Sequence, residues 1–426
     1  MIDQTPERSE TKLQRGRVSV RPADAVPRLS TRFIWLYALA WGGGVIAYAP
    51  FLTLVLPLRV EALAPRDKVA LLSAIALIGA VTASAVNILV GMLSDRGVQG
   101  PRGRRLWIGL GLAATLVCYA VIPFCGAKTA LFGGVILLQI ALNILLAPLG
   151  TLAADEVPDG QKGVVSAAMG AGGAVGMLAG VLVTAAPRLG LVGQLAIIAG
   201  LMIVCILPFL LLERRRGPLI VFPEQSPSAA LRRRQDLVRV WIARLLIQIC
   251  GGVLFAYLVY YLQTVDRSGL SVGPSDIAGQ AAWLSGSVSI ALVPLAVIVG
   301  RLSDRAGTRR PFLIATAAMV ALGLVMMAVT PRWAPAFAAY ALFSCGVGLF
   351  LTLQNAYAMQ LLANPGHRGR DMGVLNLTNT LPTVAATGLA WILARGGDFT
   401  LVMWVLAGLA VLAAGLMAFV RDASPG

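Results

Sequence analysis

The stretch Gly91-Met92-Leu93-Ser94-Asp95-Arg96 decides the fold, because the chain repeats it as Gly300-Arg301-Leu302-Ser303-Asp304-Arg305. Basic residues follow both copies, and each copy is a short charged segment between two long apolar runs. The offset of 209 residues also holds upstream, where Gly42-Gly43 corresponds to Gly251-Gly252 and Ala47-Tyr48 to Ala256-Tyr257. The repeat predicts two copies of one membrane-embedded half, an internal symmetry from which many transporters are built.

The composition requires lipid as the solvent. The chain of 426 residues is 58% hydrophobic and 13% charged, with a mean hydropathy of +0.81. A soluble fold cannot cover so much apolar surface. Apolar stretches of about 20 residues predict an all-α membrane protein of about twelve transmembrane helices in two pseudo-symmetric six-helix halves. The expected spans are 33–58, 69–93, 106–125, 130–153, 164–186, 191–212, 240–263, 277–302, 311–330, 335–362, 373–394 and 399–420.

These spans divide the chain into five segments. A basic segment at 1–30 is polar and lacks an apolar core, so we expect a cytoplasmic tail and not a cleaved signal peptide. Two halves are expected at 31–212 and 240–420, joined by a cytoplasmic linker at 213–239. A short cytoplasmic tail at 421–426 completes the predicted organisation.

The net charge of +16 is distributed asymmetrically. With the N-terminus in the cytoplasm, 27 of the 35 Lys and Arg residues fall in cytoplasmic segments, eight of them in the stretch 214–244. This positive-inside pattern predicts that both termini are cytoplasmic and that the protein lies in a bacterial inner (plasma) membrane. It also argues against nucleic acid as a partner. The expected partners are membrane lipid and a small-molecule solute, with the protein acting as a monomer.

The sequence gives no support for enzyme, metal or cofactor chemistry. The five cysteines lie in or at the ends of apolar spans without Cys-x-x-Cys spacing, and the single histidine, His367, lies in a loop. No nucleophile–base set and no phosphate-binding loop is visible. We therefore expect no enzyme activity, no cofactor and no metal site, and cysteines that act as small apolar filler.

The repeated charged segment resembles the signature loop of the major facilitator superfamily, in two copies with the correct topology. The resemblance implies that fold, with two halves that rock around a central cavity. An aspartate caps helix ends and pairs with arginines across the seam between helices, and a glycine allows close helix approach. The alternative is that these residues only anchor the topology. The residues that the resemblance assigns to a conformational latch of the outward-open state are Gly91, Asp95, Arg96, Arg104, Arg105, Gly300, Asp304, Arg305 and Arg309.

Two stretches resemble one branch of that superfamily. The loop Ser94-Asp95-Arg96 … Arg102-Gly103-Arg104-Arg105-Leu106-Trp107-Ile108 and the stretch Gly369–Pro382 are similar to segments of sucrose/proton symporters and glycoside–pentoside–hexuronide porters. The resemblance implies a sugar-type solute and proton coupling.

One departure from that branch concerns coupling. Porters of this kind that couple to a cation usually carry carboxylates inside the membrane, where charges are costly enough to be functional. All 19 acidic residues here lie in tails, in loops or at helix ends. Proton symport would therefore have to use Glu61, Asp155 or Asp371. Otherwise the protein is a facilitator driven only by the solute gradient.

The polar residues at mid-span are interpreted as neutral throughout. Gln139 and Asn143 lie four apart on one helical face, and Tyr48 and its repeat counterpart Tyr257 lie mid-span in the first and seventh helices. Amides and aromatic rings suit hydroxyl-rich, uncharged solutes, whereas the alternative for each residue is interhelical hydrogen bonding. The predicted substrate-binding residues are Tyr48, Gln139, Asn143, Gln248, Tyr257, Gln354, Asn355, Asn376 and Asn379.

The sequence therefore predicts a secondary transporter of a small neutral, sugar-like solute, with import and export both open. The runner-up is an exporter of an amphipathic drug or metabolite, favoured by the aromatic residues Trp35, Trp41 and Trp283, which are expected to face the cavity. A third hypothesis is a non-transporting assembly factor or receptor on the same scaffold. Such a protein could lose its latch residues without penalty, and both copies are intact here.

Overall fold

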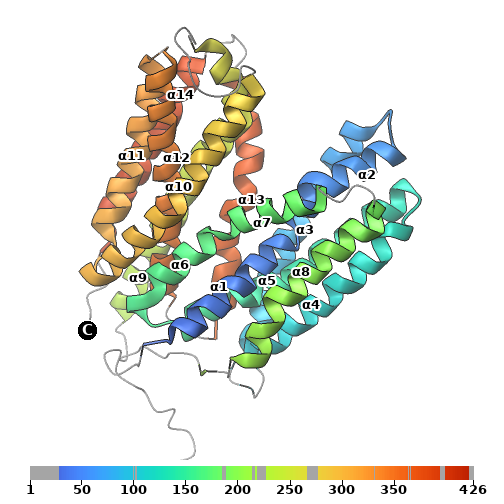
Figure 1. The fold of residues 1–426 in the computed structure, drawn as a ribbon. Helices are drawn as coiled ribbons and strands as arrows, with labels where there is room; N and C mark the ends of the chain where they lie inside the picture. Colours follow the sequence, from blue (N-terminus) through green and yellow to red (C-terminus); the bar gives the residue numbers. More distant parts are fainter. Residues whose placement is uncertain are drawn as a thin grey trace, which may run out of the picture.

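Long helices in two groups make up the protein (Figure 1). The computed structural model describes residues 28–98, 100, 103–184, 189–213, 216–217, 227–265, 277–330, 332–362, 364, 366–393 and 399–421. Helices α1–α8 form the N-terminal half and α9–α14 the C-terminal half. Most of the predicted tail at 1–30, much of the linker at 213–239 and nearly all of the tail at 421–426 lie outside the described residues.

The N-terminal half has six spans, and its first span is interrupted near the middle. A turn at Ala47 and Tyr48 leads into a π-helix, which is flanked by Pro50 and Pro57, two residues without the N–H that a regular helix uses. The Ala47 carbonyl instead accepts a hydrogen bond from the Tyr119 hydroxyl. The helices are α1 (Thr31–Ile46), η4 (Phe51–Val55), α2 (Leu56–Leu63), α3 (Lys68–Arg96), α4 (Gly103–Val121), η5 (Ile122–Phe124), α5 (Lys128–Glu156), η6 (Asp159–Gln161), α6 (Lys162–Gly170), α7 (Gly172–Thr184) and α8 (Gly190–Leu212).

The C-terminal half begins earlier than the sequence predicts. Its first helix starts at Pro227, well inside the expected linker, because proline is accepted in a first turn and no Gly or Pro follows before Gly251. This start places more of the basic stretch inside the bundle. The helices are α9 (Pro227–Thr264), α10 (Ile277–Ala306), α11 (Arg310–Val329), α12 (Trp333–Leu361), α13 (Arg368–Leu393) and α14 (Phe399–Ala418).

Eleven helical segments of the described residues are long and apolar enough to cross a membrane. The remaining expected span, 373–394, corresponds to α13, which packs against α3 and α9 in the same bundle. The expected spans thus coincide with one long helix each or, at 33–58 and 164–186, with consecutive shorter helices. The predicted fold class, an all-α membrane protein in two halves, is confirmed.

Each half has its own hydrophobic core. In the N-terminal half, Phe33, Tyr37 and Phe209 are fully buried, and their ring centroids lie 5.7–6.3 Å apart. In the C-terminal half, Phe350 and Tyr357 are buried in a separate cluster. Two nearly independent cores allow the halves to move as units.

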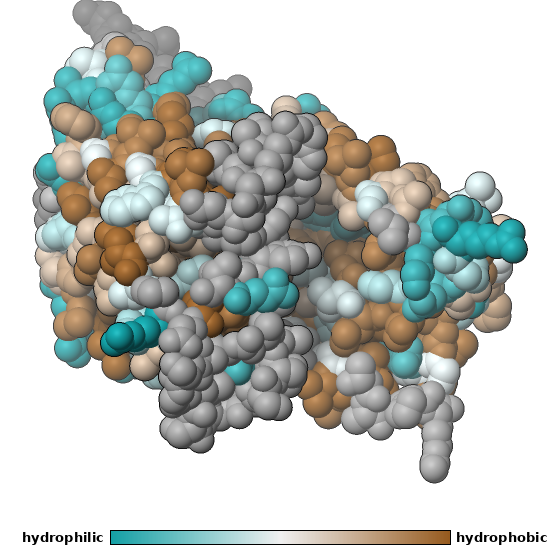
Figure 2. All heavy atoms as spheres, turned by 90° about the horizontal axis from the view of Figure 1, so that it is seen from above, coloured by the Kyte–Doolittle hydropathy of each residue, from teal (hydrophilic) through white to brown (hydrophobic). Residues whose placement is uncertain are grey.

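The halves meet at one end of the bundle and diverge toward the other (Figure 1). We call the end where α1 begins and α14 ends the terminal end, and the other the opposite end. At the terminal end α3 packs against α13, and α6 packs against α10 and α12. Seen from above, the molecule is hollowed between the halves (Figure 2).

Candidate functional site

An aspartate of α3 holds the terminal end together by capping a helix of the other half. Asp95 lies in the last turn of α3 and is 5% exposed. Its carboxylate accepts hydrogen bonds from the backbone N–H groups of Gly369 at 2.8 Å and Arg370 at 3.0 Å, in the first turn of α13. A helix N-terminus carries unpaired N–H donors and a partial positive charge. The contact therefore joins an anion to a helix dipole across the two halves.

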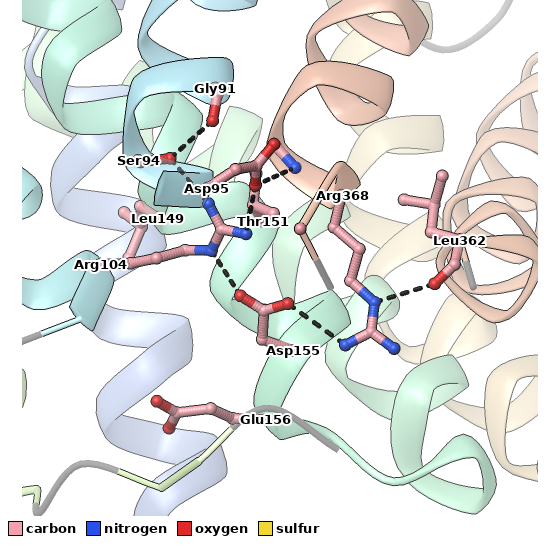
Figure 3. A network of polar contacts seen from close by, with 12 residues as sticks. Gly91, Ser94, Asp95, Arg104, Leu149, Thr151, Asp155, Glu156, Leu362 and Arg368 are labelled. Carbon is pink, nitrogen blue, oxygen red and sulfur yellow. Dashed lines mark hydrogen bonds and ion pairs between the residues drawn. The ribbon is translucent and has the colours of Figure 1, made fainter. Parts of the chain in front are cut away.

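Two arginines extend this contact into a buried network (Figure 3). Arg104, at the start of α4, donates to Asp95 at 2.8 Å and to the Ser94 hydroxyl at 2.7 Å. Its Nε donates to Asp155 of α5. Asp155 also accepts from Arg368 of α13 at 3.2 Å. One carboxylate is thus shared by an arginine of each half, and the four charges balance, as buried ions require.

The second copy of the motif forms the same contact with the halves exchanged. Asp304, near the end of α10, accepts from the backbone N–H groups of Gly163 at 3.0 Å and Val164 at 3.2 Å, at the start of α6. Arg309 donates to Asp304 and to the Ser303 hydroxyl. The repeated sequence is therefore matched by a repeated structure. We call the two contacts the Asp95 latch and the Asp304 latch.

Glycines allow the close helix approach at both latches. A side-chain carbon added to Gly91 would lie 2.2 Å from the carbonyl oxygen of Gly369. One added to Gly300 would lie 2.9 Å from the carbonyl oxygen of Gly163. Both separations are below ordinary van der Waals contact, about 3.5 Å. Gly91 and Gly300 hold the positions that the sequence predicts, and their partner glycines were not predicted.

The two latches differ in charge. Arg104 and Arg309 occupy equivalent places, but Arg104 donates to a carboxylate, Asp155, whereas Arg309 donates to the side-chain oxygen of Gln360 at 3.0 Å. A charged acceptor makes a stronger hydrogen bond than an amide. The Asp95 latch therefore includes a second carboxylate, Asp155, which an arginine of each half contacts, whereas the Asp304 latch has an amide in that place.

Three predicted latch residues do not reach the aspartates. Arg96 and Arg305 are exposed, and neither forms an ion pair with any residue in the described part of the chain. Arg105 pairs with Glu156 at 3.0 Å inside the N-terminal half, and its guanidinium lies 5.2 Å from the centre of the Phe209 ring. These three residues were predicted because they lie close to the motif in the sequence. Adjacent helical residues point in different directions, however.

A charged side chain lies at mid-depth, where the sequence analysis expects only neutral ones. Arg244 of α9 is 8% exposed and contacts Thr378 of α13. Thr378 lies nine residues, about 14 Å, along the helix from Gly369, and the hydrocarbon core is about 30 Å thick. The helix start that the sequence predicts, near residue 240, would place Arg244 among the cytoplasmic basic residues. The observed start at Pro227 places it near the middle of the bundle.

Four neutral oxygens surround the Arg244 guanidinium. Its Nε donates to the Thr378 hydroxyl at 2.7 Å. Its Nη1 donates to the side-chain oxygens of Gln354 and, at 2.6 Å, Asn355. Its Nη2 donates to Asn379 at 3.1 Å. Helices α9, α12 and α13 together build this arrangement. We define the Arg244 cluster as Arg244, Gln248, Gln354, Asn355, Asn376, Thr378 and Asn379.

Five of the nine predicted substrate-binding residues belong to this cluster. Gln248 donates to Asn379 at 2.7 Å, and Asn379 donates to Asn376 at 2.6 Å. Asn379 is exposed, and Gln248 and Asn376 are half-buried, although all lie at mid-membrane depth. Exposed amides are costly against hydrocarbon. Their exposure therefore places them beside the space between the halves.

Of the predicted pair in the N-terminal half, Asn143 forms an interhelical hydrogen bond. Asn143 accepts from Asn87 of α3 at 2.9 Å and donates to the backbone carbonyl of Gln139 at 2.8 Å. At a similar depth, the hydroxyl groups of Ser84 and Thr380 lie 2.9 Å apart and join the two halves. Asn87, Ser84 and Thr380 were not predicted, since single hydroxyls and amides carry no distinguishing sequence signal.

The two repeat-related tyrosines cannot both be placed. Tyr48 lies half-buried at the interruption of the first span. Tyr257 lies within α9, but its side chain is outside the described part. The substrate-binding role of the two tyrosines stays a prediction.

Of the three candidate coupling carboxylates, Asp155 and Asp371 lie at the terminal end and Glu61 lies away from them. Glu61 is exposed near the opposite end and pairs with Lys68. Asp371 pairs with the neighbouring Arg370 at 2.8 Å and is partly exposed. Asp155 is buried in the Asp95 latch, and it is the one of the three that joins the halves. None of the three contacts the Arg244 cluster among the described residues.

The motif, the paired halves and the latches point to one family. The family model of the Major Facilitator Superfamily matches residues 2–181, 162–387 and 277–426. The chain belongs to the major facilitator superfamily. It is a multi-pass integral membrane protein with a transporter fold. A comparison with curated proteins gave no match.

Solved structures of this superfamily share the fold. The human organic anion transporter MFSD10 (TETRAN) matches with a TM-score of 0.68 and 16% identity, covering 91% of this chain and 99% of that chain. The E. coli fucose:proton symporter FucP matches at 0.65 and 12%, covering 92% and 98%. A bacterial homologue of the iron transporter ferroportin in its outward-facing state matches at 0.67 and 15%, covering 91% and 98%. Identities this low show the fold alone.

We predict that Asp95→Asn opens the terminal end. The variant loses the charge that faces the α13 N-terminus and Arg104, and a hydrogen bond to a charged group contributes about 1.5–3 kcal/mol. Spin labels at Arg96 and His367, which lie on opposite sides of this latch, should show a longer distance population by double electron–electron resonance. The control is Asp236→Asn, because Asp236 pairs with Arg239 inside one half. Equal distance distributions for the two variants would refute the role of the latch.

Proposed function

We propose that this protein is a secondary transporter that moves a small, hydrogen-bonding organic solute by alternating access. The observation that carries the proposal is the position of the Arg244 cluster. It lies at mid-depth between two halves that are latched at the terminal end and apart at the opposite end (Figure 1). A solute could enter this site from one side only until the latches release.

A sugar-like solute fits the chemistry of the cluster. Amide side chains offer both donors and acceptors to hydroxyl groups. The stretch Gly369–Pro382, which resembles sucrose/proton symporters and glycoside–pentoside–hexuronide porters, supplies Asn376, Thr378 and Asn379 to the cluster. The resemblance and the site therefore fall on the same helix. The FucP structure, named for fucose, supports a sugar through its shared fold.

The charge distribution supports an orientation. The basic residues of the loops gather at the terminal end, which we propose faces the cytoplasm of a bacterial cell, with the protein as a monomer in the inner membrane. The opposite end then faces outward, and the described conformation is outward-open. The direction of net transport follows from the gradients and not from this conformation.

The alternative of an amphipathic exporter has little support from the tryptophans that favoured it. Trp35 lies one turn into α1 at the terminal end and is 72% exposed. Trp41 packs inside the N-terminal half, against Gly150 and Gly172. Trp283 packs against Phe337 in a tilted arrangement, with ring centroids 5.4 Å apart. None of the three contributes to the Arg244 cluster.

We predict that Asn379→Ala lowers solute uptake into proteoliposomes by about tenfold or more, because it removes a group that a solute would meet in the cluster. Uptake would be measured with a panel of radiolabelled sugars and sugar acids, against protein-free vesicles. Asn364→Ala is the control, because Asn364 is an exposed amide in a loop at the terminal end. Transport of no panel member by the unsubstituted protein would count against the proposal, as would equal loss in both variants.

Proton symport is a further proposal, with Asp155 as the coupling carboxylate. Opening the terminal end would separate Asp155 from Arg368, so the charge state of Asp155 is linked to conformation. Solute uptake should then acidify the lumen of proteoliposomes that contain a pH dye. Asp155→Asn should abolish that signal while solute exchange persists. If a transported solute moves no protons between about pH 5 and 8, the protein is a facilitator.

A further inference from the structure

We propose that the transported solute carries a carboxylate or a similar oxoanion, and that Arg244 is the residue that binds it. This inference rests on the proposed function and names the substrate class of the same site. A hydroxylated carboxylate of about the size of a sugar acid satisfies both parts of the Arg244 cluster. Its hydroxyl groups suit the amides, and its charge suits the arginine.

Arg244 differs from every other buried arginine of the described residues. Four arginines there are buried, namely Arg104, Arg244, Arg309 and Arg368. Three of them contact a carboxylate: Arg104 and Arg368 contact Asp155, and Arg309 contacts Asp304. Arg244 contacts only neutral oxygens. The other three buried arginines of the described residues therefore have a carboxylate partner. Arg244, beside the central space, has no anionic partner among these residues.

A buried cation without a counter-charge is costly in a membrane, so its retention indicates function. Among the described residues, the carboxylates that lie closest to Arg244 along α9 and α13 already have partners: Asp236 pairs with Arg239, and Asp371 pairs with Arg370. Asp95, Asp155 and Asp304 are taken up by the two latches. The counter-charge for Arg244 must then come from outside the protein. A solute that enters between the halves can supply it.

A second observation in the same cluster points to an acceptor-rich ligand. Gln354 is fully buried, and its Oε1 accepts from Arg244, whereas its Nε2 has no hydrogen-bond partner among the described residues. An unpaired buried N–H donor costs about 1–3 kcal/mol. Arginine also has five N–H donors, of which four are used here. The cluster thus presents unused N–H donors of Gln354 and Arg244 beside one positive charge, which is the complement of a carboxylate.

The purely structural alternative is that Arg244 cross-links α9, α12 and α13. Its four bonds do join these helices. A neutral glutamine could make several of them without the cost of a buried charge, however. The exposure of Asn379, which contacts both Arg244 and Gln248, also shows that the cluster is open on one side. An arginine that only cross-links helices would not require a cluster that is open on one side.

The test compares glucuronate with glucose, which differ by a carboxylate at one carbon. Binding to the purified full-length protein would be measured by isothermal titration calorimetry and by thermal shift. Glucuronate should bind at least about tenfold more tightly than glucose, and added salt should weaken the glucuronate binding. Arg244→Gln should remove the preference, and Arg244→Lys should keep part of it. Arg310→Gln is the matched control, because Arg310 donates to the Ala418 carbonyl.

Each outcome decides the inference. Equal or tighter binding of glucose overturns the anionic solute and leaves the proposed transporter of neutral sugars standing. If the Arg244→Gln variant still prefers glucuronate, the anionic solute stands and only the role of Arg244 is overturned. If neither probe binds, the inference as stated is overturned. Uptake of the other panel solutes then decides the proposed function separately. If Arg244→Gln fails to fold, the partial preference of Arg244→Lys and the probe comparison on the unsubstituted protein still decide.

Discussion

The rest of the structure depends on a carboxylate that lies against a helix N-terminus of the other half. Asp95 binds the first N–H groups of α13, and Asp304 binds those of α6. Each contact needs a glycine pair so that the helices can approach. Because charge and dipole meet only at this short separation, the latches are either formed or lost. In the described conformation both latches are formed.

Because the terminal end is closed and the halves diverge toward the opposite end, the central polar residues can serve as a binding site. In a bundle closed at both ends, the buried charge of the Arg244 cluster would only destabilise the protein. Between halves that diverge, a solute can reach the cluster. The same helix, α13, carries both features: its first turn binds Asp95, and its Thr378 and Asn379 bind Arg244 about 14 Å further along. A change at the cluster can thus be passed to the latch through one rigid element, in the manner of a population shift.

Much of this could be predicted from the sequence, for identifiable reasons. The repeat around Asp95 and Asp304 carries a strong signal, because two copies at one offset rarely arise by chance. Arg244 was missed because it follows a basic stretch, and only the helix start at Pro227 shows its depth. The pairing of Asp155 with Arg368 joins residues more than 200 positions apart. No local pattern predicts such a contact, nor which face of a helix meets the seam.

The central claim is that the Arg244 cluster faces a space that is open on the side away from the latches. Asn379→Cys tests it most directly, because Asn379 is the exposed member of the cluster. A membrane-impermeant maleimide would be applied to intact cells and to inverted vesicles, with the unsubstituted protein setting the background from its five cysteines. The account predicts labelling from outside the cell. Labelling only in inverted vesicles, or in neither preparation, would contradict it.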